Sequence, residues 1–137
     1  MELYIGGYAQ GKLDYVRNKY KEREWRILDG QNAGIDIMVE METVVDKKGS
    51  ESILFYHFHL WVKKLLAEGK NPEQLTEIFL EKYPGCVILA DEVGNGIVPM
   101  EAQDREYRER LGRILISLAA KAERVERVIC GMGQRLK

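Results

Sequence analysis

Apolar and polar residues along the first part of the chain follow two periods, one typical of strands and one typical of helices. Residues 1–5 form a short apolar run that stops at two glycines, as a buried strand does. Apolar residues then recur at helical spacing among charged ones over residues 13–20, which predicts a helix. A second apolar run over residues 25–30 ends in Asp-Gly and predicts another strand closed by a turn.

The middle of the chain predicts two helices with recognisable ends. Helical spacing predicts the first over residues 53–68, with Gly69 as the residue that ends it. Asn71 followed by Pro72 is typical of an N-cap and first helical position, so a second helix is expected to follow. The preceding stretch, residues 31–52, fits either an edge strand or an irregular helix, and both interpretations stay open.

The last third of the chain predicts two strands around a long helix. Residues 86–90 are continuously apolar, which is typical of a central strand of a parallel sheet. A glycine-bearing loop over 91–100 precedes the strongest helical pattern, at 102–123, and a last short strand is expected over 124–130. This alternation predicts an α/β fold with three layers and a mainly parallel sheet.

Length, charge and cysteine content narrow the class of protein. With 137 residues, the chain is expected to be a single domain, 1–137. Its formal net charge of −1 gives no long-range field to attract nucleic acid or an acidic membrane surface. We find no apolar run long enough for a membrane span and no secretory signal pattern. Cys86 and Cys130 lie in apolar segments and are expected to be buried free thiols of a cytoplasmic protein.

A glycine loop with a lysine lies between the first predicted strand and the first predicted helix. Gly6, Gly11 and Lys12 have the spacing G-x-x-x-x-G-K of a phosphate-binding loop. Glycines let backbone N–H groups turn toward a phosphate, while the helix N-terminus and the lysine add positive charge. The alternative is a tight turn with a chance lysine. The residues expected to bind nucleotide are Gly6, Gly7, Tyr8, Ala9, Gln10, Gly11, Lys12 and Leu13.

One position in this loop departs from the usual pattern. The residue after the lysine is normally Ser or Thr, whose hydroxyl ligates Mg²⁺, and here it is Leu13. Leucine cannot ligate a metal, so Mg²⁺ must be held by other groups, held weakly, or absent. Tyr8 and Gln10 within the loop could contact a base or simply cover the loop.

Two acidic residues, Asp29 and Glu92, follow the carboxyl ends of predicted strands. In open α/β sheets ligands bind at that edge. A carboxylate there can take Mg²⁺ or orient a substrate hydroxyl. We therefore expect catalytic roles for Lys12, Asp29 and Glu92, with both carboxylates as candidate Mg²⁺ ligands. The alternative for Asp29 is a turn aspartate before Gly30.

The loop after the central predicted strand resembles a known family. Residues 92–99, Glu-Val-Gly-Asn-Gly-Ile-Val-Pro, look like the signature of the adenosylcobinamide kinase/adenosylcobinamide-phosphate guanylyltransferase family of cobalamin biosynthesis. Residues 6–12 match the phosphate loop of the same family. The resemblance continues through Arg105, Arg108, Gly112, Arg113, Leu118, Ala119, Ala120, Val125, Val128, Gly131 and Lys137.

The resemblance implies a P-loop NTPase-like fold, here reduced in size, and two activities. Members of the family phosphorylate the aminopropanol hydroxyl of adenosylcobinamide with ATP or GTP, and then transfer GMP to that phosphate through a guanylylated histidine. It also implies a trimer, so the expected partners are GTP or ATP, a cobinamide-type corrinoid and further copies of this chain. Arg105 and Arg108 share a helix face, as solvated charges or as contacts to phosphate or Glu92.

Two departures from the family pattern separate the alternatives. The chain passes from its first helix to the next strand without the segment that carries the guanylyl-accepting histidine. His57 and His59, inside the predicted helix, are expected to pack in the core or an interface, with a phosphate contact by His57 as the alternative. With Leu13, this leaves three interpretations: an enzyme of corrinoid metabolism, a member that binds nucleotide or corrinoid without turnover, and a relative in fold alone.

Overall fold

The computed structural model describes residues 1–34, 37, 52–94 and 100–137, which form a six-stranded sheet in the order β2-β3-β4-β1-β5-β6. The first five strands run parallel, and β6 pairs antiparallel with β5. The prediction of an α/β fold with a mainly parallel sheet is therefore confirmed. The strands are β1 (Glu2–Gly6), β2 (Trp25–Asp29), β3 (Ser52–Tyr56), β4 (Val87–Asp91), β5 (Arg124–Ile129) and β6 (Met132–Arg135).

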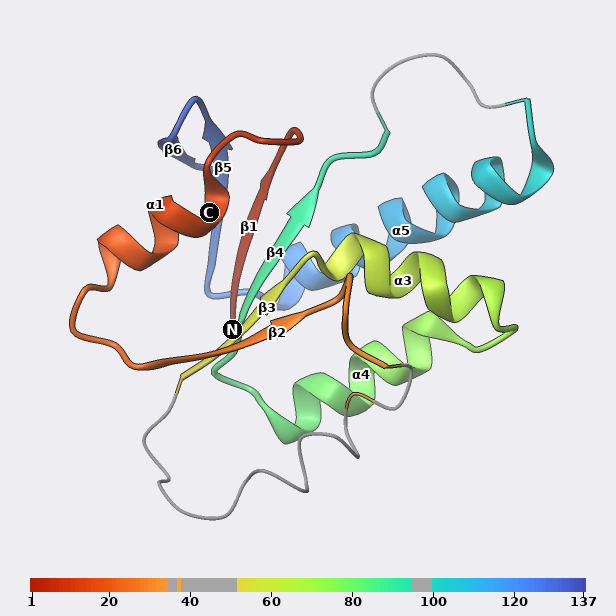
Figure 1. Cartoon of the computed structure of the whole chain (residues 1–137), viewed down its shortest axis with the longest axis horizontal. Coiled ribbons are helices and arrows are strands. Elements are labelled where there is room, and N and C mark those ends of the chain that lie inside the picture. Colours follow the sequence, from red (N-terminus) through yellow and green to blue (C-terminus); the bar gives the residue numbers. More distant parts are fainter. Residues whose placement is uncertain (35–36, 38–51, 95–99) are drawn as a thin grey trace.

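The described helices cover both faces of the sheet and give three layers (Figure 1). On one face, Val16 of α1 packs into a small core that includes Tyr4. On the other face, α3, α4 and α5 contribute Trp61, Phe79 and Leu111 to a larger core. The helices are α1 (Lys12–Lys19), α3 (Phe58–Ala67), α4 (Pro72–Lys82) and α5 (Ala102–Lys121).

The central strand β4 is buried on both faces, as its continuous apolar run predicts. Val87 and Leu89 belong to the core beneath α1, whereas Ile88 and Ala90 belong to the core beneath the other helices. β4 pairs with β1 so that Gly6 lies opposite Asp91. The carboxyl ends of these two strands therefore meet at one edge, where the glycine loop begins.

The prediction of a helix over residues 53–68 is wrong in its first part. Residues 52–56 form β3, which pairs in parallel with β2 on one side and β4 on the other, and α3 begins only at Phe58. A short apolar run fits either period. Here the strand is more stable than a helix, because its backbone N–H and C=O groups form hydrogen bonds with both β2 and β4, and Leu54 and Phe55 become fully buried.

The end of the chain also differs from the prediction. The last predicted strand, 124–130, ends at Ile129, and the chain turns back through Cys130 and Gly131 into β6. Cys130 is consequently exposed at the hairpin turn, so the prediction that it is buried is wrong. Cys86 is buried as predicted, and burial raises the pKa of its thiol to about 12.

Two predicted helix ends are confirmed. Gly69 follows α3 with φ = +67°, a conformation that favours glycine. The Asn71 side chain accepts a hydrogen bond of 3.0 Å from the backbone N–H of Gln74 and so caps α4. Residues 35–36 and 38–51, which make up most of the uncertain stretch, lie outside the described residues. Among the described helices, none combines the length and apolar character needed to cross a membrane.

Candidate nucleotide site

The glycine loop connects the end of β1 to the start of α1 in a conformation that needs glycine at two positions. Gly11 precedes α1 with φ = +79°. At Gly6, an added Cβ would lie 2.4 Å from the carbonyl oxygen of Val128, which is closer than real Cβ atoms come. The loop therefore passes against β5 and then turns directly into the helix, whose N-terminus carries unpaired N–H groups and a partial positive charge.

Lys12, the first residue of α1, is folded into this loop and is 5% exposed. Its Nζ donates a hydrogen bond of 2.7 Å to the carbonyl oxygen of Gly7 and lies 2.6 Å from Oδ1 of Asp91. These contacts hold the ammonium group at the carboxyl edge of β1 and β4. A phosphate bound in the loop would meet this positive charge together with the backbone N–H groups.

A cavity of about 470 Å³ opens over this loop. Its volume lies within the range of small-molecule sites. The wall that faces the loop comes from the carboxyl ends of β3 and β4, where open α/β sheets bind ligands. The lining residues are Tyr8, Ala9, Gln10, Gly11, Lys12, Leu13, Asp14, Gln31, Tyr56, His57 and Asp91.

Asp29, the last residue of β2, holds a histidine of this wall in place. Its Oδ1 lies 2.8 Å from Nδ1 of His57 and also accepts a hydrogen bond of 2.9 Å from the backbone N–H of Gln31. The His57 ring is stacked on Tyr56 with a centroid distance of 3.6 Å. A carboxylate accepts at this distance, so Nδ1 carries a proton and Nε2 is left to meet a ligand.

The two histidines have different surroundings. His59 is buried, its Nδ1 accepts a hydrogen bond of 3.1 Å from the backbone N–H of Asp91, and burial lowers its pKa. The expectation of a satisfied core residue is therefore confirmed for His59. For His57 the expectation of core packing is wrong. Residues 52–56 form β3, so His57 lies just beyond the carboxyl end of that strand, where it lines the cavity.

Glu92 lies next to the cavity wall but takes part in a different contact. Its Oε2 accepts a hydrogen bond of 2.8 Å from Arg127, and Glu92 is not among the described residues that line the cavity. Asp91, one position earlier, is the carboxylate beside Lys12. The apolar run predicts a strand that ends at residue 90, whereas β4 continues to Asp91. The end of that run could have identified Asp91, which follows it directly, as the carboxylate at the strand end.

Arg105 and Arg108 hold the two ends of the loop that precedes α5. Arg105 donates a hydrogen bond to the carbonyl oxygen of Met100, and Arg108 donates one of 2.7 Å to that of Gly94. Neither is among the described residues that line the cavity. Residues 95–99 of the family signature lie outside the described residues.

In this conformation the predicted Mg²⁺ ligands contact other protein groups. Asp29 is engaged by His57, and Glu92 by Arg127. Leu13 provides no hydroxyl. In the part of the chain that the structure describes, no group of three or more His, Cys, Asp and Glu side chains could hold a metal ion.

Curated proteins of two enteric bacteria match part of this sequence. The chain is 41% identical over 79 residues to the bifunctional adenosylcobalamin biosynthesis protein CobU of Escherichia coli (strain K12). The aligned segment covers 56% of this chain and 44% of that protein. It is also 41% identical over 58 residues to the protein of the same name from Salmonella typhimurium (strain LT2). This aligned segment covers 42% of this chain and 32% of that protein. The matched segments therefore span less than half of either relative.

The model of the cobinamide kinase / cobinamide phosphate guanyltransferase family matches a much larger share of the chain. The match runs over residues 17–136 and so includes β2 to β6 and all of α3, α4 and α5. The glycine loop precedes the matched residues, so its interpretation depends on its own spacing and geometry. With most of its length matched, the chain belongs to the cobinamide kinase / cobinamide phosphate guanyltransferase family.

Proposed function

We propose that this protein is a single P-loop domain that phosphorylates a hydroxyl group of a cobinamide-type corrinoid with ATP or GTP. The observation that carries the proposal is the placement of Lys12: a buried lysine in a glycine loop, beside Asp91 and facing a cavity at the carboxyl edge of the sheet. Membership of the family supports the corrinoid as acceptor, and the names of the relatives describe adenosylcobalamin biosynthesis proteins.

In this proposal the loop residues and Lys12 bind the phosphates. The acceptor oxygen forms a bond to the γ-phosphorus while the bond between that phosphorus and the β–γ bridging oxygen breaks, and the nucleoside diphosphate leaves. Lys12 and the N-terminus of α1 stabilise the negative charge on the phosphoryl oxygens. Lys12 already lies at the carboxyl edge, where its Nζ contacts Gly7 and Asp91, so phosphate binding exchanges one of these contacts for a phosphoryl oxygen.

The Asp29–His57 pair gives the acceptor side of the site its chemistry. With Nδ1 fixed by Asp29, Nε2 of His57 accepts the hydrogen bond of the acceptor hydroxyl and takes its proton as phosphorus–oxygen bond formation proceeds. Asp29 is thus a positioning residue that acts through His57. Glu92 has a supporting role through Arg127, which fixes the end of β4.

Mg²⁺ normally accompanies the phosphates of a nucleotide in P-loop enzymes. The described residues include no cluster of three or more metal-ligating side chains, but Mg²⁺ bound to nucleotide phosphates needs only one or two carboxylates, so Asp29 and Glu92 stay the candidate ligands. No step of the proposal depends on the ion. We also leave guanylyl transfer out of the proposal, because the family resemblance places the guanylylated histidine in a segment that has no counterpart here. Trimeric assembly is a further proposal from the same resemblance, and a cytoplasmic location is one from the free cysteines.

A second candidate is a family member that binds nucleotide or corrinoid without turnover. Leu13 favours it, because a leucine at this position removes the hydroxyl that holds the metal ion in active P-loop enzymes. The kinase must bind nucleotide and turn it over, whereas the second candidate binds nucleotide or corrinoid and does not, so binding and turnover need to be measured on the same protein.

Calorimetric titration of GTP and of ATP, with and without Mg²⁺, into the wild type and Lys12→Ala tests the proposal. We expect binding that Lys12→Ala weakens about tenfold or more, since hydrogen bonds between charged groups are lost. Release of nucleoside diphosphate in the presence of cobinamide then tests the kinase. Binding with turnover no faster than Lys12→Ala would favour the second candidate. If neither GTP nor ATP binds, the kinase proposal is refuted, and titration of cobinamide then tests the second candidate.

A further inference from the structure

The hairpin formed by β5 and β6 lies against the glycine loop, although the two are at opposite ends of the chain (Figure 1). The contact is concentrated on one residue, Gln10. Its side-chain Oε1 accepts a hydrogen bond of 2.7 Å from the backbone N–H of Cys130, and its backbone carbonyl accepts one of 2.9 Å from the N–H of Gly131. One residue of the loop therefore takes both N–H groups of the hairpin turn.

The hairpin turn is shaped to present these two N–H groups together. Cys130 and Gly131 have φ = +50° and +73°, the left-handed pair typical of a two-residue type I′ turn. The turn also fits closely against the loop, because a Cβ added to Gly11 would lie 3.5 Å from Cα of Gly131.

The hydrogen bond to the carbonyl of Gln10 has a consequence for the next peptide group. In a planar trans peptide the C=O and the following N–H point in opposite directions. Because the carbonyl of Gln10 points at Gly131, the N–H of Gly11 points away from the hairpin. Gly11 lines the cavity, and an N–H that faces away from the hairpin is not occupied by it and can donate to a phosphate bound there.

We propose that Gln10 is a positioning residue of the nucleotide site: it holds the glycine loop against the β5–β6 hairpin and so keeps the N–H of Gly11 turned toward the phosphates. Its amide oxygen acts on the hairpin and not on the nucleotide base. The hairpin thereby becomes a working part of the site. This inference rests on nucleotide binding by the loop, as in the function proposed above.

Two substitutions at Gln10 separate this role from a base contact or a general effect on folding. Gln10→Met keeps the length of the side chain and removes the acceptor, whereas Gln10→Glu keeps an acceptor oxygen at the same reach. Gln103→Met is the matched control, because it makes the same exchange at an exposed position of α5 that does not line the cavity. Calorimetry gives the nucleotide Kd of each, and thermal unfolding reports on the fold.

We expect Gln10→Met to weaken nucleotide binding about fivefold to tenfold with little change in melting temperature, since it removes one hydrogen bond. In 0.5 M salt, chosen to screen the added charge, Gln10→Glu should bind within about twofold of the wild type, as should the control Gln103→Met. Hydrogen exchange at Cys130 and Gly131 should slow when nucleotide binds to the wild type, and much less in Gln10→Met.

Three results would overturn the inference. If the wild type binds nucleotide and Gln10→Met binds equally well, Gln10 does not position the loop and the proposed function stands. If Gln10→Met loses binding together with a large fall in melting temperature, the effect is on the fold as a whole. If the wild type binds neither GTP nor ATP, the proposed function fails and the inference fails with it.

Discussion

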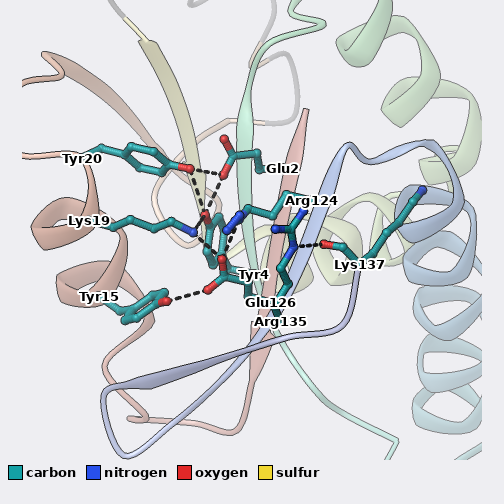
Figure 2. A network of polar contacts seen from close by, with 9 residues as sticks. All are labelled: Glu2, Tyr4, Tyr15, Lys19, Tyr20, Arg124, Glu126, Arg135 and Lys137. Atoms are coloured by element: carbon teal, nitrogen blue, oxygen red, sulfur yellow. Dashed lines mark hydrogen bonds and ion pairs between the residues drawn. The ribbon is translucent and has the colours of Figure 1, made fainter.

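The carboxylate of Glu126 is buried beneath α1 in a network of charged and phenolic groups (Figure 2). Glu126, on β5, is 2% exposed. It accepts hydrogen bonds from Lys19, from Arg124 at 2.7 Å and from the Tyr15 hydroxyl at 2.6 Å. Lys19 also donates one of 3.0 Å to the Tyr4 hydroxyl. Because Lys19 and Tyr15 belong to α1, this network fastens the helix that follows the glycine loop to the sheet.

Replacing Glu126 by glutamine should therefore destabilise the fold. The variant keeps the size of the side chain and removes the negative charge between Lys19 and Arg124. Removing one partner of a fully buried ion pair costs about 3–5 kcal/mol. Here the Lys19 and Arg124 side chains are 22% and 27% exposed, so water recovers part of that loss. We expect the free energy of unfolding at pH 7 to fall by about 2 kcal/mol.

The same network makes the effect depend on pH. Burial alone would raise the pKa of Glu126, but hydrogen bonds from Lys19 and Tyr15 outweigh burial and hold that pKa below its usual value. A lowered pKa in the folded state means that the stabilisation is complete above the unfolded pKa of about 4.3. It is lost as pH falls through the folded-state pKa. The difference between wild type and Glu126→Gln should be constant near neutrality and shrink in acid.

Urea unfolding followed by tryptophan fluorescence measures this difference. Trp25 is a suitable probe, because its ring centroid lies 6.0 Å from that of Tyr20, which belongs to the network. Glu109→Gln is the matched control. Glu109 forms an exposed ion pair with Arg113 on α5, and such pairs contribute about 0.5 kcal/mol or less. If Glu126→Gln costs no more than Glu109→Gln at pH 7, the network does not stabilise the fold and the reasoning is refuted.

Three further substitutions test separate parts of the structure. Gly6→Ala should lower the free energy of unfolding by about 1–3 kcal/mol in urea titrations, because the new Cβ would lie 2.4 Å from the carbonyl oxygen of Val128. Leu13→Thr supplies the missing hydroxyl, so calorimetric nucleotide binding should become stronger with Mg²⁺ than without it. Glu73→Gln removes the charge that strengthens the two hydrogen bonds from Arg110, which lower the pKa of Glu73, but the pair is partly exposed to water and should contribute only about 1 kcal/mol in the same urea titrations.

Much of the fold follows from apolar patterning, and the errors occur where that pattern is ambiguous or absent. The run over 86–90 predicts a central strand because each of its residues is buried on one face or the other. Residues 53–56 are equally apolar but join a helical pattern without a break, so local sequence does not separate β3 from α3. β6 is exposed along its whole length and has no apolar pattern to detect. Its position depends on the turn after Ile129.

The candidate site shows the same division. The spacing of Gly6, Gly11 and Lys12 identifies the loop from sequence, because it reflects a local strand–turn–helix geometry. The contact of Lys12 with Asp91 depends on the pairing of β1 with β4 and cannot be read from either segment. The contact of Gln10 with Cys130 is still harder to predict from sequence, since the two residues are 120 positions apart in the chain.

Because the sequence does not predict β3, it also does not predict that Asp29 contacts His57. These residues come together because β2 and β3 are parallel neighbours and both residues stand at carboxyl ends. If Asp29 acts through His57 alone, Asp29→Asn and His57→Gln should each lower kcat about 10²-fold without changing the nucleotide Kd. The double variant should then be no slower than the slower single variant, because removing the imidazole leaves the carboxylate nothing to hold. Losses that multiply in the double variant would mean that Asp29 contacts a substrate or a metal ion by itself, and the positioning role would be refuted.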